Sequence, residues 1–159
     1  MYVDFDQLSE TSRVWIFQAN RSFTEEELAE IEGFMKEYIN NWTSHGTSLR
    51  ASFELRYKRF LIVAADENQH LGGCSIDDMV RIIQELEKKY QVDLLDKMNV
   101  SFKQGEFIAY KPLNEFKKMV QQKSVSAKTI VFNNLVTNIY EYRNDWEVPL
   151  EDSWHSRFL

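Results

Sequence analysis

Hydrophobic and polar positions divide the chain into segments with two different periods. In residues 24–42 and 75–90 the apolar side chains recur every three or four positions, which is the spacing of one buried helix face. Residues 48–56 alternate between apolar and polar types, as in a strand with one face in solvent. Residues 59–66 are apolar apart from their two ends, which predicts a strand buried on both faces at the centre of the fold.

The helix predicted over residues 24–42 has a well-marked beginning. Thr24 is suited to the N-cap position, and Glu27 follows three residues later, as a capping box requires. The end of this helix is expected at His45 and Gly46, because glycine commonly follows the last helical turn.

The remaining periodic segments are shorter. A tight link near Tyr57 joins the strands at 48–56 and 59–66 into an antiparallel hairpin. We further predict strands at 13–19, 99–103, 106–111 and 129–133, one helical turn at 93–98, and helices at 112–123 and from Thr137 to Trp146.

This order of elements predicts an α+β fold with a mainly antiparallel sheet and helices packed on one face. The first six elements match the ferredoxin-like βαββαβ pattern, and the last four would form a C-terminal β-α-β-α extension. The length of 159 residues is that of about one domain. We therefore predict a single globular domain over residues 1–159, with residues 1–11 loose unless Tyr2 and Phe5 dock.

The C-terminal tail, residues 147–159, is expected to be docked because it holds too much apolar surface to leave in water. It would cover its own sheet or, in a homodimer, the sheet of a second copy. The apolar side chains at and near this tail are Trp146, Leu150, Trp154 and Phe158.

Composition indicates a soluble protein. The chain is 43% hydrophobic and 28% charged, as is usual for globular proteins. Its formal charge of −6 argues against a nucleic-acid surface over the whole chain. The single cysteine cannot form an internal disulfide, and neither a signal peptide nor a membrane-spanning apolar run is recognisable. We expect a cytoplasmic location and no membrane partner.

Several common catalytic motifs are missing from the sequence. It has no G-x-x-x-x-G-K-[ST], no G-x-G-x-x-G, no H-E-x-x-H and no G-x-S-x-G. His45, His70 and His155 are too scattered for the ligand spacing of a metal site. We predict neither a metal nor a cofactor.

Several short motifs spread over nearly the whole chain resemble those of a family of short bacterial proteins often labelled "ABC transporter ATPase". They are Ser-Arg-Val-Trp-Ile near the start, Arg-Phe-Leu-Ile with Asp66-Glu67, Gly73-Cys-Ser-Ile-Asp, Asp93-Leu with Met98-Asn99, Val131-Phe-Asn-Asn-Leu-Val and Asp152-Ser-Trp-His-Ser-Arg-Phe near the end. The resemblance implies membership of this family but no mechanism. An ATPase activity conflicts with the residues after Gly72 and Gly73, which are Cys-Ser where a P-loop has Gly-Lys-Ser.

Cys74 is the one candidate nucleophile near a helix end. We expect Ser75 to cap the second helix, so that Cys74 precedes it, and unpaired backbone amides there could stabilise a thiolate. Asp66, Asp77 and His70 are its candidate proton partners. The alternative interpretation is a small buried side chain in a loop, which we favour because free cysteine is among the most buried residue types.

A lysine-rich stretch at 97–128 holds seven Lys and two Glu with aromatic residues between them. Such a stretch can bind nucleic acid. Here the aromatics fall at core-like positions, which favours a solvated lysine face and no nucleic-acid partner.

Two classes of function stay open. The sequence favours a non-catalytic cytosolic interaction or regulatory domain that binds a protein partner through a sheet face or its aromatic tail. The alternative is a small enzyme or thiol-based redox protein that uses Cys74.

Overall fold

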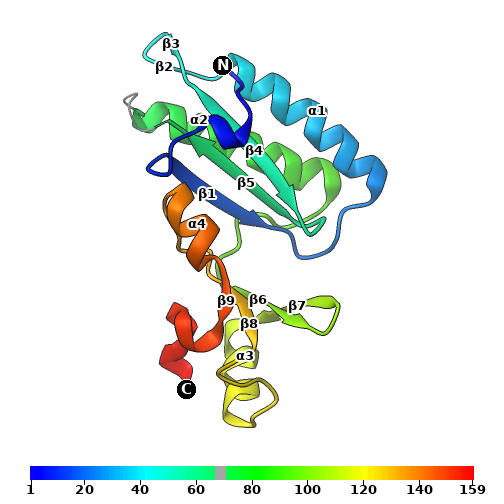
Figure 1. The fold of residues 1–159 in the computed structure, drawn as a ribbon. Helices are drawn as coiled ribbons and strands as arrows, with labels where there is room; N and C mark the ends of the chain where they lie inside the picture. Colours follow the sequence, from blue (N-terminus) through cyan, green and yellow to red (C-terminus); the bar gives the residue numbers. More distant parts are fainter. Residues whose placement is uncertain (67–70) are drawn as a thin grey trace. The chain divides into compact units, whose positions relative to one another are not determined.

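The computed structural model describes residues 1–66 and 71–159, and Figure 1 shows their fold. The chain has an α+β fold with antiparallel sheets. It divides into two compact units, which comprise residues 1–95 with 137–139, and residues 96–136 with 140–159. Nothing in the composition marks this division, and the single domain stays a prediction.

The main sheet of the first unit has three strands in the order β1 (Arg13–Gln18), β5 (Phe60–Ala65) and β4 (Ala51–Arg56), all antiparallel. The predicted central position of β5 is confirmed. All six of its side chains are buried, because both faces of the sheet are covered at this strand.

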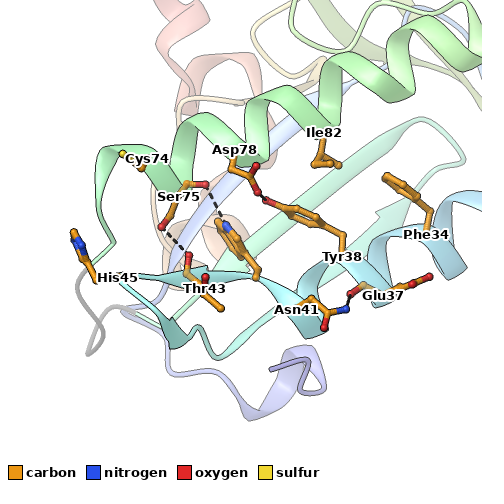
Figure 2. Close-up of a pocket in the computed structure, with 11 residues that line it drawn as sticks. Phe34, Glu37, Tyr38, Asn41, Thr43, His45, Cys74, Ser75, Asp78 and Ile82 are labelled. Atoms are coloured by element: carbon orange, nitrogen blue, oxygen red, sulfur yellow. Dashed lines mark hydrogen bonds between the residues drawn. The ribbon is translucent and has the colours of Figure 1, made fainter.

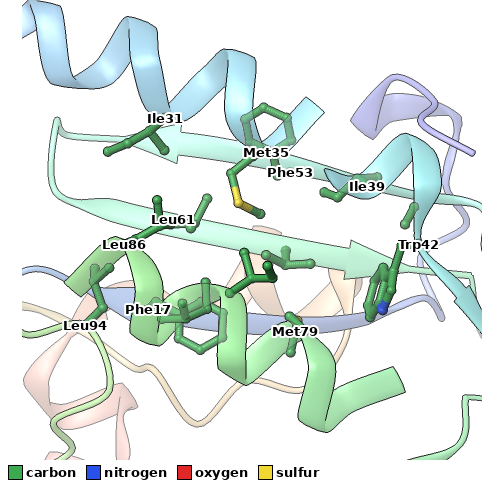
Figure 3. Packing of buried hydrophobic residues seen from close by; sticks show 14 of the residues in the cluster. Phe17, Ile31, Met35, Ile39, Trp42, Phe53, Leu61, Met79, Leu86 and Leu94 are labelled. Atoms are coloured by element: carbon green, nitrogen blue, oxygen red, sulfur yellow. The ribbon is translucent and has the colours of Figure 1, made fainter. Parts of the chain in front are cut away.

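Two helices cover one face of this sheet, as predicted (Figure 3). They are α1 (Glu25–Asn41) and α2 (Gly73–Tyr90). Ile31, Met35 and Ile39 of α1 and Met79, Ile83 and Leu86 of α2 share a core with Leu61, Val63 and Ala65 of β5. Phe60, Ile62 and Ala64 lie on the opposite face, which agrees with the alternation along a strand.

The capping box of α1 is confirmed. The hydroxyl of Thr24 accepts from the Glu27 N–H at 3.1 Å, and the Glu27 carboxylate accepts from the Thr24 N–H at 2.9 Å. The predicted cap at His45 and Gly46 is wrong, since the C-cap is Trp42. His45 and Gly46, with φ of 52° and 78°, instead form the turn between β2 (Thr43–Ser44) and β3 (Thr47–Ser48).

The prediction that residues 1–11 are loose is also wrong. The Met1 ammonium donates to the carbonyl of Leu49 at 2.6 Å, and the Val3 N–H donates to the carbonyl of Ala51 at 3.0 Å. Phe5, in the short helix η1 (Phe5–Gln7), and Leu8 are buried. The backbone groups at the outer edge of β4 hold this segment, which sequence periodicity could not show.

The ferredoxin-like topology is not confirmed. The order β1-β5-β4 fits its first three strands, but the next strand, β6 (Asn99–Gln104), belongs to another sheet. That sheet lies in the second unit and has the order β7-β6-β8-β9, where β7 is Phe107–Pro112, β8 is Ile130–Phe132 and β9 is Glu147–Pro149.

The turn of helix predicted at 93–98 does not form. The Glu87 carboxylate accepts from the N–H groups of Leu94 and Leu95, and the Asp96 carboxylate accepts from the Met98 N–H. Carboxylates therefore satisfy the backbone donors that a helical turn would have used.

The C-terminal tail is docked, as predicted. Leu150, which begins η2 (Leu150–Asp152), is fully buried, and β9 pairs with β8. Phe158, in η3 (Trp154–Phe158), packs edge-on against Phe116 of α3 (Leu113–Gln121), with the two ring centroids 6.3 Å apart. The remaining helix, α4, spans Ile139–Asp145. Docking through a homodimer stays a prediction.

His155 makes the stability of the second unit dependent on pH. Its side chain is buried beside the Ser153 hydroxyl, 2.7 Å from Nδ1, and burial lowers the pKa of His155 from 6.5 to about 4. Between these values the unfolded chain binds a proton that the folded protein does not. The free energy of unfolding should therefore fall by about 3 kcal/mol as the pH is lowered through this window.

This pH dependence can be measured by denaturant unfolding between pH 4 and 7, followed through the amide signals of α3. His155→Gln should flatten the dependence, whereas His45→Gln, at an exposed position, should leave it in place. Equal pH dependence in His155→Gln and the parent protein would contradict this role of His155.

Candidate functional site

A groove of about 740 Å³ in the first unit is the best candidate for a binding site (Figure 2). The C-terminal half of α1, the hairpin that follows it and the N-terminal half of α2 form its walls. Its lining residues are Phe34, Glu37, Tyr38, Asn41, Trp42, Thr43, His45, Cys74, Ser75, Asp78 and Ile82.

Polar contacts hold the two helices together along the groove. The indole Nε1 of Trp42 donates to the carbonyl of Ser75 at 3.1 Å, and the Ser75 hydroxyl donates to the carbonyl of Thr43 at 2.9 Å. One turn before Trp42 in α1 and one turn after Ser75 in α2, the Tyr38 hydroxyl donates to the Asp78 carboxylate at 2.8 Å. The contacts pair the end of α1 with the beginning of α2, so the helices run antiparallel.

The charged network of the groove is centred on Asp78. Its carboxylate accepts from the Arg81 guanidinium at 2.8 Å and from Tyr38, and these two hydrogen bonds lower the pKa of Asp78. Burial, with the hydrogen bond to Asp78, raises the pKa of Tyr38 well above its ordinary value. Near neutral pH Tyr38 is therefore a neutral donor and Asp78 an ionised acceptor.

The surroundings of Cys74 differ from the prediction. The N-cap of α2 is Gly72, so Cys74 lies within the first helical turn, and its side chain is exposed at the rim of the groove. The interpretation of Cys74 as a buried side chain is wrong. The predicted cap at Ser75 is wrong as well, because Ser75 is buried and its hydroxyl bonds Thr43.

Of the candidate proton partners that the structure describes, neither Asp66 nor Asp77 makes a hydrogen bond to Cys74. Within residues 1–66 and 71–159, the side chains of Cys74 and Asp77 make no hydrogen bond or ion pair, and Asp77 does not line the groove. Asp66 follows β5, and its N–H donates to the carbonyl of Arg50. His70 lies outside the described residues.

Sequence reasoning missed most of the groove. His45 reaches it because the hairpin turn carries it there, and a Cβ added at Gly72 would lie 3.0 Å from the His45 Nε2 atom. A larger residue at position 72 would therefore have to displace the exposed His45 ring. Phe34 could have been found from the sequence, because it is a large apolar residue outside the buried stripe of α1. In the structure its side chain is 38% exposed.

The described residues contain no group of three His, Cys, Asp or Glu side chains placed to hold a metal ion. In the lysine-rich stretch, three lysines are paired with carboxylates. Lys103 pairs with Glu147, Lys128 with Glu151 and Lys111 with Glu115. This pairing favours the interpretation of a solvated face.

The chain matches no known protein family, no curated protein and no solved structure. None of the described helices is long and apolar enough to cross a bilayer. The family resemblance therefore stays a prediction, and the function has to be argued from the groove itself.

Removing the Tyr38 hydroxyl should change the titration of Asp78. Tyr38→Phe takes away one of two hydrogen-bond donors, so the pKa of Asp78 should rise toward its ordinary value. Arg81→Gln should raise it further, because the Arg81 hydrogen bond is the larger cause. A carboxyl group whose pKa is lowered by folding stabilises the folded state at pH values above its ordinary pKa, and this stabilisation is lost as the pH falls. Both variants weaken this effect, so both should lose less stability than the parent protein on acidification.

The measurement is an NMR titration of the Asp78 carboxylate carbon. Tyr140→Phe removes an exposed tyrosine hydroxyl in the second unit and serves as the matched control. An unchanged Asp78 titration in Tyr38→Phe would show that the hydroxyl does not bond this carboxylate in solution.

Proposed function

We propose that this chain is a non-catalytic interaction domain whose α1–α2 groove binds a basic, amphipathic segment of a partner protein. The observation that carries the proposal is the combination of exposed aromatic surface with acidic surroundings in one open groove. Tyr38 and Asp78 are already hydrogen-bonded to each other, and Trp42 to Ser75, which favours binding over chemistry.

The apolar part of the groove can anchor a partner side chain. Phe34, Tyr38 and Ile82 lie around the same hollow (Figure 2), and Phe34 stays 38% exposed. Burial of an aromatic or aliphatic side chain against such a surface contributes about 1.5–3 kcal/mol. Aromatic residues in a pocket are also typical binding hot spots.

The charge around the groove selects a basic partner. Helix α1 carries six Glu and one Lys, and Glu37 lines the groove. The first unit as a whole has 17 acidic and 10 basic residues, a net charge of −7, whereas the second has 8 acidic and 9 basic residues. Lysine or arginine side chains of a partner would therefore be attracted to this unit and oriented by it.

A catalytic role has less support from the groove residues. Asp78 is engaged by both Tyr38 and Arg81, and the Cys74 side chain has no hydrogen-bond partner among the described residues. A nucleophile needs a base within hydrogen-bond reach. The described residues place no such pair in the groove.

A helix-forming dodecapeptide with leucines on one face and lysines on the other is the probe for this proposal. It should shift the amide signals of residues 34–45 and 74–82, and a version with glutamate in place of lysine should not. Phe34→Ala should weaken the binding at least tenfold, or about 1.4 kcal/mol. Glu37→Lys should weaken it through charge repulsion.

Two matched variants make this experiment decisive. Leu135→Ala removes an exposed apolar side chain from the second unit, and Glu26→Lys repeats the charge change at an exposed position of α1 outside the groove. Both should bind nearly as the parent does. Equal weakening by Glu26→Lys and Glu37→Lys would reduce the result to general charge attraction and overturn the proposal.

The exposure of Cys74 favours a second candidate function, a thiol-based activity at the same groove. If the first turn of α2 activates this thiol, its alkylation should remain fast at a lower pH than that of a cysteine in an unstructured peptide. The measurement is the alkylation rate by iodoacetamide between pH 5 and 10. An identical profile for the protein and the peptide would remove this candidate.

A further inference from the structure

We infer that the α1–α2 groove binds an arginine side chain of its partner, held between the ring of Phe34 and the carboxylate of Glu37. The inference rests on the proposed function and deepens it, because it names the side chain that fills the hollow. The chemistry that recognises this side chain is a flat aromatic face beside an unpaired carboxylate.

Aromatic rings supply one wall of the groove. Phe34 and Tyr38 are four residues apart in α1, so their side chains lie on the same face of the helix. Figure 2 shows both rings on the side of α1 that faces α2. The next ring, that of Trp42, is buried, and its centroid lies 6.0 Å from that of Tyr38. Phe34 therefore offers the accessible ring face, since its side chain stays largely in solvent.

The two carboxylates that line the groove differ in how they are engaged. Asp78 already accepts from Arg81 at 2.8 Å, and Arg81 also pairs with Glu85 at 2.9 Å, so carboxylates of α2 balance its charge. In the part of the chain that the structure describes, the exposed carboxylate of Glu37 makes no hydrogen bond or ion pair. Glu37 follows Phe34 by three residues, within one helical turn, so a cation over the Phe34 ring can reach it.

The chain holds one complete example of this arrangement, near the beginning of α1. The guanidinium of Arg21 lies over the ring of Phe23, with Cζ 5.7 Å from the ring centroid. Its two Nη atoms donate to the two carboxylate oxygens of Glu27 at 2.8 and 2.9 Å. A phenylalanine ring and a nearby glutamate therefore hold one guanidinium there. Phe34 and Glu37 present the same two groups, and no cation of the described residues lies over the Phe34 ring.

An arginine fits this hollow better than a wholly apolar side chain or a lysine does. An apolar side chain over Phe34 would take the Glu37 carboxylate partly out of water without giving it a donor, which costs free energy. The stem of an arginine can pack against Ile82, while its planar head stacks on the ring and donates two hydrogen bonds to the carboxylate. A lysine ammonium has neither the flat face nor the paired donors.

The test uses the full chain and three versions of the leucine–lysine dodecapeptide, in which one leucine at the centre of the apolar face is replaced by arginine, citrulline or lysine. Citrulline has the shape of arginine without its charge, and lysine has the charge without the planar head. Affinities are measured from the amide shifts of residues 34–45 and 74–82. The arginine peptide should bind about tenfold more tightly than the citrulline peptide and about threefold more tightly than the lysine peptide.

Two variants separate the ring from the carboxylate. Phe34→Leu keeps an apolar side chain but removes the aromatic face, so it should leave the binding of the original leucine peptide nearly unchanged. Glu37→Gln removes the charge at almost the same size. Each variant should reduce the preference for arginine over citrulline to about threefold or less. Glu26→Gln removes a charge at an exposed position of α1 outside the groove, and it should keep the full preference.

Equal binding of the arginine and citrulline peptides in the groove would overturn the inference and leave the proposed function standing. A preference for arginine that neither Phe34→Leu nor Glu37→Gln reduces would also overturn it, because the preference would then come from general charge attraction. If no peptide, the leucine peptide included, shifts the amides of the groove, the proposed function and the inference are both overturned.

Discussion

The burial of β5 on both faces is the constraint on which the first unit depends. Its six side chains are at most 1% exposed, and each large one contributes about 1.5–3 kcal/mol when taken out of water. A three-stranded sheet cannot cover its own faces, so helices α1 and α2 must lie side by side on one of them. The antiparallel arrangement brings the end of α1 to the beginning of α2, and that meeting point is where the groove forms.

The hydrogen bonds at the groove join the two helices. Tyr38 of α1 is paired with Asp78 of α2, and Trp42 bonds Ser75 at one end of the groove. Buried polar groups of this kind have to be paired, because an unpaired one costs about 1–3 kcal/mol. The same contacts therefore stabilise the unit and leave Phe34 and Ile82 beside an open hollow.

Local patterns were sufficient to predict most elements of the fold. The period of α1, its capping box at Thr24 and the apolar run of β5 all depend on neighbours in the sequence, and all three are confirmed. The failures came from distant partners. The N-terminal segment is held by Leu49 and Ala51, and β6 pairs with β8 across about thirty residues in a second sheet. Propensity carries no information on such pairings.

The groove was harder to predict than the fold for a related reason. Cys74 is chemically distinctive in the sequence, but its neighbours in the groove are not the residues near it in sequence. The residues that do surround it come from α1 and the hairpin after it, as Trp42 and His45 show. Because a hairpin turn with positive φ takes the place of the predicted cap at His45, the loop reaches α2 and forms the end of the groove. A local feature of turn chemistry thus fixes both the shape of the site and the side chains that a partner would meet.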